Sequence, residues 1–165
     1  VLGFDRTQLE ELVQLNDGVV IANDNSSSQV VLSGIPQAVE KVTQELQCKR
    51  AIPLQVSGAF HSPLMEEASI AFAKELDQVS FSEAIAPVIS NSDPQPSTNG
   101  FLLKERLKKQ MTTGVRWRES MEVMIAEGVT TIVEIGPGNV LSGLAKRSLK
   151  GITTNQIASS SDLGY

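Results

Sequence analysis

The chain has 165 residues, of which 41% are hydrophobic and 20% charged, a composition typical of one globular domain. Its 14 basic and 19 acidic residues give a net charge of −5, which argues against a general nucleic-acid binder. No apolar run approaches the ~20 residues that span a bilayer, and a single cysteine, Cys48, excludes an internal disulfide and a cysteine-based metal cluster.

Residues 1–57 carry strand and helix signals in the order β-α-β-β-α-β. Helices are expected after Asp5 and after Pro36, strands at 19–22, 29–33 and at the alternating Ile52, Leu54 and Val56, and a turn at 24–27. This is the order of a ferredoxin-like domain in which only a stub of the first strand is present.

Beyond Gly58, strands and helices alternate, which favours a parallel sheet covered by helices. Ser62 and Pro63 predict a helix start, followed by a buried stripe of Leu64, Ala68, Phe72 and Leu76. Further strands are expected at 87–89, at 129–135 as a buried run, and at 152–157, and a loop is expected at the proline-rich 93–97. Further helices are expected around Leu103, around Trp117, and after Gly138 with Val140, Leu141 and Leu144 facing inward. Because strands 87–89 and 129–135 have too few neighbours for a stable sheet, this segment is expected to be part of a larger α/β domain.

The only histidine, His61, lies between a predicted strand and a predicted helix start. Loops held by rigid elements are where catalytic groups usually lie, and histidine is a common acid–base group near neutral pH. The alternative is a partly exposed histidine that bonds to backbone near the helix cap.

A catalytic histidine needs a nucleophile, and the sequence contains no nucleophile elbow of the form Gly-x-Ser-x-Gly. The serines at 26–28 and Ser142 are interpreted as turn and helix hydroxyls. The glycines at 136 and 138 lack the third glycine of a dinucleotide fingerprint, because position 141 is leucine. We therefore predict a sharp turn there, and neither a cofactor nor a metal.

Four segments, in chain order, resemble the motifs of malonyl-CoA:acyl-carrier-protein transacylases. They are NDNS followed by QVVLSG at 23–34, GAFHSPLM at 58–65, Gln110 followed by VRW at 115–117, and EIGPGNVLSGL at 134–144. Four motifs in the same order are far more specific than any one of them.

The resemblance implies a mixed α/β architecture in which a ferredoxin-like small subdomain is inserted into an α/β-hydrolase-like large subdomain. Residues 1–57 would form the nearly complete small subdomain, and residues 58–165 the C-terminal part of the large one. The family's nucleophilic serine, its malonate-binding arginine and an N-terminal glutamine precede the insert, so they are expected upstream of Val1.

The implied activity is transfer of a malonyl group from coenzyme A to the phosphopantetheine thiol of acyl carrier protein in fatty-acid synthesis, by a ping-pong mechanism through a serine. By resemblance, His61 is the general base and acid, oriented by the backbone carbonyl of Gln110. Asn25 and Phe60 would line the substrate pocket, where the Phe60 ring leaves little room for an α-methyl group. Residues 1–165 alone are expected to be inactive, and the full-length protein to be a monomer in the cytoplasm, a plastid or another organelle lumen.

A cluster of basic residues stands out in this acidic chain, and it includes Lys104, Lys108, Lys109 and Arg116. It is either a solvated helix face or a surface that steers an acidic carrier protein. Two other functions stay open at this stage: a non-catalytic ferredoxin-like binding module in which His61 has no role, and an acyltransferase domain cut from a multidomain synthase.

Overall fold

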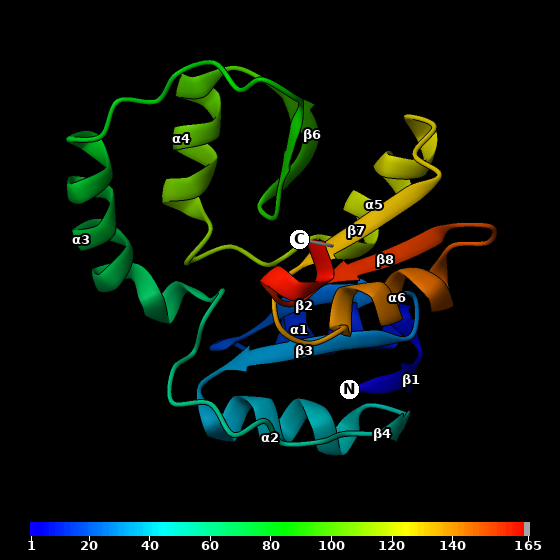
Figure 1. Ribbon diagram of the computed structural model, residues 1–165. Helices are drawn as coiled ribbons and strands as arrows, with labels where there is room; N and C mark the ends of the chain where they lie inside the picture. The colour runs from blue at the N-terminus through cyan, green and yellow to red at the C-terminus, as the bar shows by residue number, and fades with distance from the viewer. Residues whose placement is uncertain (164–165) are drawn as a thin grey trace. The chain divides into compact units, whose positions relative to one another are not determined.

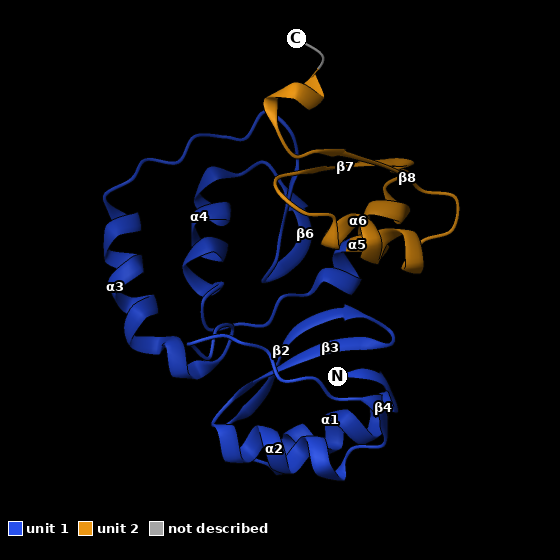
Figure 2. Ribbon diagram, turned by 60° about the horizontal axis from the view of Figure 1, so that its bottom comes forward, with its two compact units in different colours: residues 1–120 blue, residues 121–165 orange. Residues whose placement is uncertain are grey.

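The computed structural model describes residues 1–163 as a mixed α/β protein (Figure 1). The chain divides into two compact units, Val1–Ser120 and Met121–Tyr165 (Figure 2). The last two residues of the predicted segment 58–165 lie outside the described part. No helix in residues 1–163 combines the length and apolar character needed to cross a membrane.

The first unit begins with a four-stranded sheet and two helices. Its elements are β1 (Leu2–Phe4), α1 (Arg6–Leu15), β2 (Val19–Ser26), β3 (Gln29–Gly34), α2 (Pro36–Glu45) and β4 (Cys48–Arg50). The strands are antiparallel and lie in the order β2-β3-β1-β4. The sequence therefore predicted the order of the elements along the chain.

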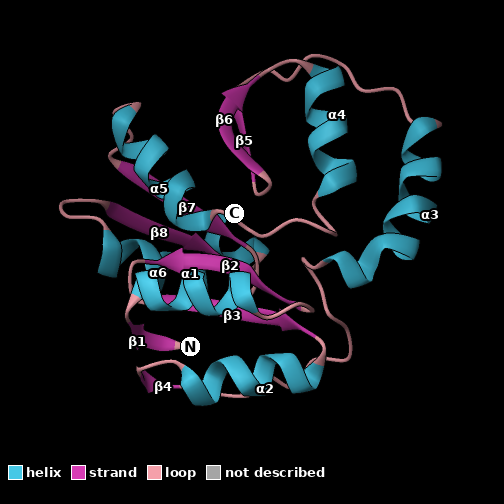
Figure 3. Cartoon of the chain, turned by 180° about the vertical axis from the view of Figure 1, so that it is seen from behind, coloured by secondary structure: helices cyan, strands magenta, loops and turns pink. Residues whose placement is uncertain are grey.

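Helix α1 and the sheet share the main core of this unit (Figure 3). Leu9 of α1, Val30 of β3 and Leu46 after α2 are almost fully buried in one cluster. The predicted cap of α1 is present, because Asp5 Oδ1 accepts a hydrogen bond from the backbone N–H of Gln8 at 2.8 Å.

The remainder of the first unit pairs two helices with a β-hairpin. Its elements are the 3-10 helix η1 (Pro63–Met65), α3 (Glu66–Asp77), β5 (Val88–Ser90), β6 (Asp93–Ser97), α4 (Gly100–Lys109) and the start of α5 (Trp117–Ala126). Helices α3 and α4 lie side by side in Figures 1 and 3. The buried Arg106 of α4 binds the hairpin, through Asp93 Oδ2 at 2.6 Å and the carbonyl of Gln95 at 2.6 Å.

The second unit contains the rest of α5 and a β-α-β arrangement. Strand β7 (Thr131–Ile135) pairs in parallel with β8 (Thr153–Ile157), α6 (Val140–Ser148) connects them, and η2 (Ser160–Leu163) follows. The parallel pairing agrees with the prediction from alternating strands and helices.

The strand predicted at Ile52, Leu54 and Val56 is wrong. The last strand of the small sheet is β4, Cys48–Arg50, and the three apolar side chains that follow it are exposed. Strand β4 pairs only with β1, which is three residues long, so the pairing ends where Arg50 faces Leu2. Residues 52–56 alternate like a strand, but no neighbouring strand is present for them to pair with.

The loop predicted at 93–97 is also wrong, because these residues form strand β6. Strand β6 pairs on one side only, with β5, and its two prolines are compatible with an edge strand that leaves one row of backbone groups unpaired.

Several side chains predicted to be buried are exposed instead. The strand β7 expected to be buried has Ile135 79% exposed, and Leu64, Ala68, Val140 and Leu141 are exposed as well. Within the second unit, α6 contacts both strands, and one helix covers only one face of a two-stranded sheet. Leu76 and Leu144, in contrast, are buried as predicted.

Candidate active site

The histidine predicted to be catalytic has a distinctive backbone. Within residues 1–163, His61 is the only non-glycine residue with a positive φ, 59°. Such a conformation is uncommon for a residue with a side chain, so surrounding contacts must maintain it. The next residue, Ser62, is buried, and its hydroxyl donates to the carbonyl of Ala59 at 2.6 Å and accepts from the backbone N–H of Leu64 at 3.3 Å.

Two consecutive carbonyls hold His61. Its Nδ1 lies 2.8 Å from the carbonyl oxygen of Gln110, and its backbone N–H donates to the carbonyl of Met111 at 3.0 Å. A carbonyl can only accept a hydrogen bond, so Nδ1 carries the proton and Nε2 of the neutral ring keeps its lone pair. The contact between His61 and Gln110 that the resemblance implied is therefore present.

The segment that holds His61 is itself attached to the edge of β2. The backbone N–H of Val115 donates to the carbonyl of Ala22 at 2.8 Å, and the N–H of Asp24 donates to the carbonyl of Val115 at 2.8 Å. Val115 is buried, and its backbone forms a parallel bridge with Asn23. The short connection between α4 and α5 is therefore an extra strand-like neighbour of β2.

An ionic contact strengthens the same edge. Asp24 lies between two arginines: its Oδ1 is 2.8 Å from Arg6, and its Oδ2 is 2.9 Å from Arg118. The Asp24 side chain is only 14% exposed. Sequence reasoning missed this cluster because it assigned Asp24 and Asn25 to a turn, whereas β2 continues to Ser26 and the turn is at 27–28.

The two residues predicted to line the substrate pocket take different positions. Asn25 is partly buried in β2, and its side-chain amide makes no hydrogen bond within the described residues. Phe60 is 51% exposed, and its ring lies close to Gly58, where a Cβ atom would be 3.0 Å from the ring. Within residues 1–163, no hydrogen bond joins Asn25 to His61.

Much of the basic cluster is already neutralised. Lys108 Nζ lies 2.6 Å from Asp77 and 2.7 Å from Glu105, and this bonding raises the pKa of Lys108. Arg116 Nε donates to Glu119 at 2.9 Å. Of the other two residues, Lys104 donates to the carbonyl of Val79, and Lys109 is exposed and forms no ion pair within residues 1–163.

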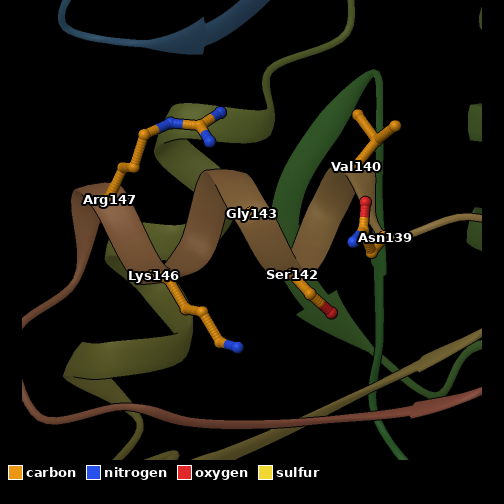
Figure 4. Close-up of a pocket in the computed structure, with 6 residues that line it drawn as sticks. All are labelled: Asn139, Val140, Ser142, Gly143, Lys146 and Arg147. Atoms are coloured by element: carbon orange, nitrogen blue, oxygen red, sulfur yellow. The ribbon is translucent and has the colours of Figure 1, made fainter.

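A pocket of about 370 Å³ lies along α6 in the second unit (Figure 4). Its lining consists of Asn139, Val140, Ser142, Gly143, Lys146 and Arg147. Figure 4 shows Asn139 and Val140 at the start of the helix and the two cations further along it. The lining contains neither a histidine nor a carboxylate, so it offers no acid–base pair for acyl transfer.

The start of α6 is capped from the preceding strand. The carboxylate of Glu134 accepts hydrogen bonds from the backbone N–H groups of Leu141 at 3.0 Å and Ser142 at 2.8 Å. The Ser142 side chain, followed by these backbone N–H groups, lowers the pKa of Glu134. No group of three or more metal-ligating side chains occurs in the part of the chain that the structure describes.

A histidine whose Nδ1 contacts a backbone carbonyl keeps the lone pair of its neutral form on Nε2, and such a ring can accept and return a proton there. The chain belongs to the acyl transferase domain family, whose model matches residues 2–162.

The similar proteins are malonyl CoA-acyl carrier protein transacylases. The chain is 46% identical over 163 residues to the one from Synechocystis sp., covering 99% of this chain and 56% of the relative. It is 42% identical over 161 residues to the one from Bacillus subtilis, covering 93% and 51%. The chain therefore spans about half the length of these relatives.

Solved structures of proteins of the same kind have folds similar to that of this chain. The crystal structure of the Synechocystis malonyl-CoA:ACP transacylase has a TM-score of 0.95 at 46% identity and covers 99% of this chain and 56% of its own. A malonyl-transacylase in complex with the acyl-carrier protein of a type II PKS has a TM-score of 0.86 at 31% identity and covers 99% and 55%.

Proposed function

We propose that the protein transfers a malonyl group from coenzyme A to the phosphopantetheine thiol of acyl carrier protein, with His61 as its acid–base group. The observation that carries this proposal is the 2.8 Å contact between His61 Nδ1 and the carbonyl of Gln110, which leaves Nε2 free to accept a proton. The relatives named above are malonyl CoA-acyl carrier protein transacylases, which fits this substrate pair.

In the first half-reaction, His61 Nε2 takes the proton of a serine hydroxyl as the serine oxygen attacks the malonyl thioester carbon. The carbon–sulfur bond breaks, His61 returns the proton to the sulfur, and coenzyme A leaves as the thiol. In the second half-reaction, His61 deprotonates the phosphopantetheine thiol, which attacks the seryl ester, and the serine recovers the proton. Proton transfer from a positioned group typically contributes about 10²–10⁴-fold.

The carbonyl of Gln110 has two roles in these steps. It holds the ring in the tautomer that presents an unprotonated Nε2, and it accepts a hydrogen bond from the imidazolium that forms when Nε2 takes the proton. The serine is proposed to come from a part of the protein outside residues 1–165, because no nucleophile elbow occurs in this chain.

The domain organisation is also a proposal. Residues 1–57 form a ferredoxin-like small subdomain, supported by the strand order β2-β3-β1-β4 and the two helices between the strands. Residues 58–165 belong to an α/β-hydrolase-like large subdomain, supported by the parallel pair β7–β8 with α6 between them.

Asn25 and Phe60 contact the substrate, and the cluster of Lys104, Lys108, Lys109 and Arg116 receives the carrier protein. The complete protein acts as a monomer in the cytoplasm or an organelle lumen without a cofactor.

The deciding experiment replaces His61 with Ala in the protein as its gene encodes it. We expect kcat/KM for malonyl transfer to acyl carrier protein to fall by about 10²–10⁴-fold, measured with labelled malonyl-CoA. Gln110→Ala is the matched control, because it removes the side chain but keeps the carbonyl that His61 contacts, so its rate stays near wild type. A wild-type rate for His61→Ala would reject the proposal and favour a binding module. Residues 1–165 alone are expected to show no turnover.

A further inference from the structure

The connection that holds His61 approaches β2 closely at Gly114. A Cβ atom at this position would lie 2.6 Å from the carbonyl oxygen of Ile21. Real Cβ contacts are essentially never this short, so any side chain at Gly114 forces the connection and the strand apart. The φ of Gly114 is not in the left-handed region, so the requirement for glycine comes from the neighbouring strand and not from backbone conformation.

The strand cannot move away easily to make room. Ile21 pairs with Leu32 of β3, and Ile21 and Leu32 both pack against the cluster around Leu9 and Val30. The connection is the freer of the two partners, because it joins α4 to α5 and, among the described residues, two backbone hydrogen bonds attach it to β2. A side chain at Gly114 would therefore displace the connection.

Displacement of the connection would directly disturb the hydrogen bonds that hold His61. Gln110 and Met111 are four and three residues before Gly114, and their carbonyls are the two groups that bond to His61. The positive φ of His61 gives the residue a tendency to relax once these bonds are lost.

We propose that Gly114 is a positioning residue for the transfer reaction: the absence of its side chain lets the 110–116 connection pair with β2, and this pairing sets the tautomer and place of the His61 ring. The inference rests on the proposed function of His61 for its effect on rate. Its effect on the tautomer is independent of that function.

The test compares Gly114→Ala with Thr112→Ala in the protein as its gene encodes it. Thr112→Ala lies in the same connection and loses only a 3.3 Å bond to the carbonyl of Lys109, so it is the matched control. The ¹⁵N spectrum of the histidine rings reports the tautomer, with the His61 signals identified by their loss in His61→Ala. We expect Nδ1–H in the wild type and in Thr112→Ala, and a mixture of tautomers in Gly114→Ala.

The kinetic readout separates positioning from substrate binding. We expect kcat for Gly114→Ala to fall by about 10–100-fold, since small misplacements of catalytic groups have effects of this size, with KM for malonyl-CoA little changed. An unchanged tautomer in a folded Gly114→Ala protein would overturn the inference and leave the proposed function intact. Loss of the Nδ1–H tautomer without any loss of rate would support the positioning and reject the proposed role of His61.

A second measurement needs no variant and applies even if Gly114→Ala does not fold. Native-state hydrogen exchange of the wild-type protein follows the backbone amides of Asp24, Val115 and His61, which donate to carbonyls across this junction. We expect all three to become exposed in one opening event with the same denaturant dependence. Exchange of the His61 amide independently of the other two would overturn the inference.

Discussion

At the scale of single residues, the structure defines which ring nitrogen of His61 carries the proton in the neutral form. A histidine in a loop has two neutral tautomers, and the carbonyl of Gln110 selects the one with the proton on Nδ1. The φ of 59° at His61 shows that this orientation is held against the local preference of the backbone. The sequence identified the residue type, and the carbonyl partner decides which nitrogen can react.

A prediction at the same scale concerns Phe60, whose ring is half exposed beside His61. If this ring limits the room at the α-carbon of the substrate, Phe60→Ala admits an α-methylated malonyl thioester. We expect the ratio of kcat/KM for the methylated over the unmethylated substrate to rise by about 10-fold or more, because one methyl group changes discrimination by about 1–3 kcal/mol. Competition between the two thioesters measures this ratio, and an unchanged ratio would remove Phe60 from the pocket.

At the scale of elements, the cap of α6 depends on one carboxylate. Glu134 bonds to two backbone N–H groups at the start of the helix, where negative charge is favourable. Its pKa in the folded state is lowered, so the ionised carboxylate stabilises the folded protein at pH values above its ordinary pKa of 4.5. This contribution to stability disappears as the pH falls through the lowered pKa.

We therefore expect Glu134→Gln to lower the Tm at pH 7, since an amide binds the helix start more weakly than a carboxylate. The difference in Tm between wild type and variant should shrink towards acid pH, once the wild-type carboxylate is protonated. Thermal unfolding of both proteins from pH 7 to pH 3 measures it, with Glu127→Gln as a control without such a cap. A difference that stays constant over this range would contradict the account.

At the scale of the whole molecule, the charge pattern bears on the proposed attraction of a carrier protein. Ion pairs neutralise Lys108 and Arg116, so the exposed Lys109 is expected to carry more of the long-range attraction. We expect Lys109→Glu to reduce kcat/KM for acyl carrier protein several-fold at low salt, with KM for malonyl-CoA unchanged, and the effect to fade as salt is added. Lys41→Glu on α2 makes the same change of charge outside the cluster. Equal effects of the two variants would show that only net charge matters.

Sequence reasoning was successful where the signal is local. Periodicity, caps and the alternation of strands and helices predicted α1, α2 and the parallel pairing of β7 with β8. It failed where the pairing between strands decides whether a segment is a strand. Residues 52–56 alternate like a strand but have no partner strand, whereas residues 93–97 contain two prolines and pair with β5. Asp24 was assigned to a turn because Asp, Asn and Ser are common turn residues. Its two arginine partners are far away in the sequence and give no local signal.

The sequence by itself determined the order of most elements and offered His61 as the candidate acid–base residue, because helix caps, periodicity and residue chemistry act over a few positions. Only the tertiary structure decided which carbonyl holds His61, that the 110–116 connection pairs with β2, and that Gly114 must lack a side chain. The physical reason is distance along the chain. Hydrogen bonds between groups that are 49 or more residues apart depend on where the fold places them and leave no local pattern in the sequence.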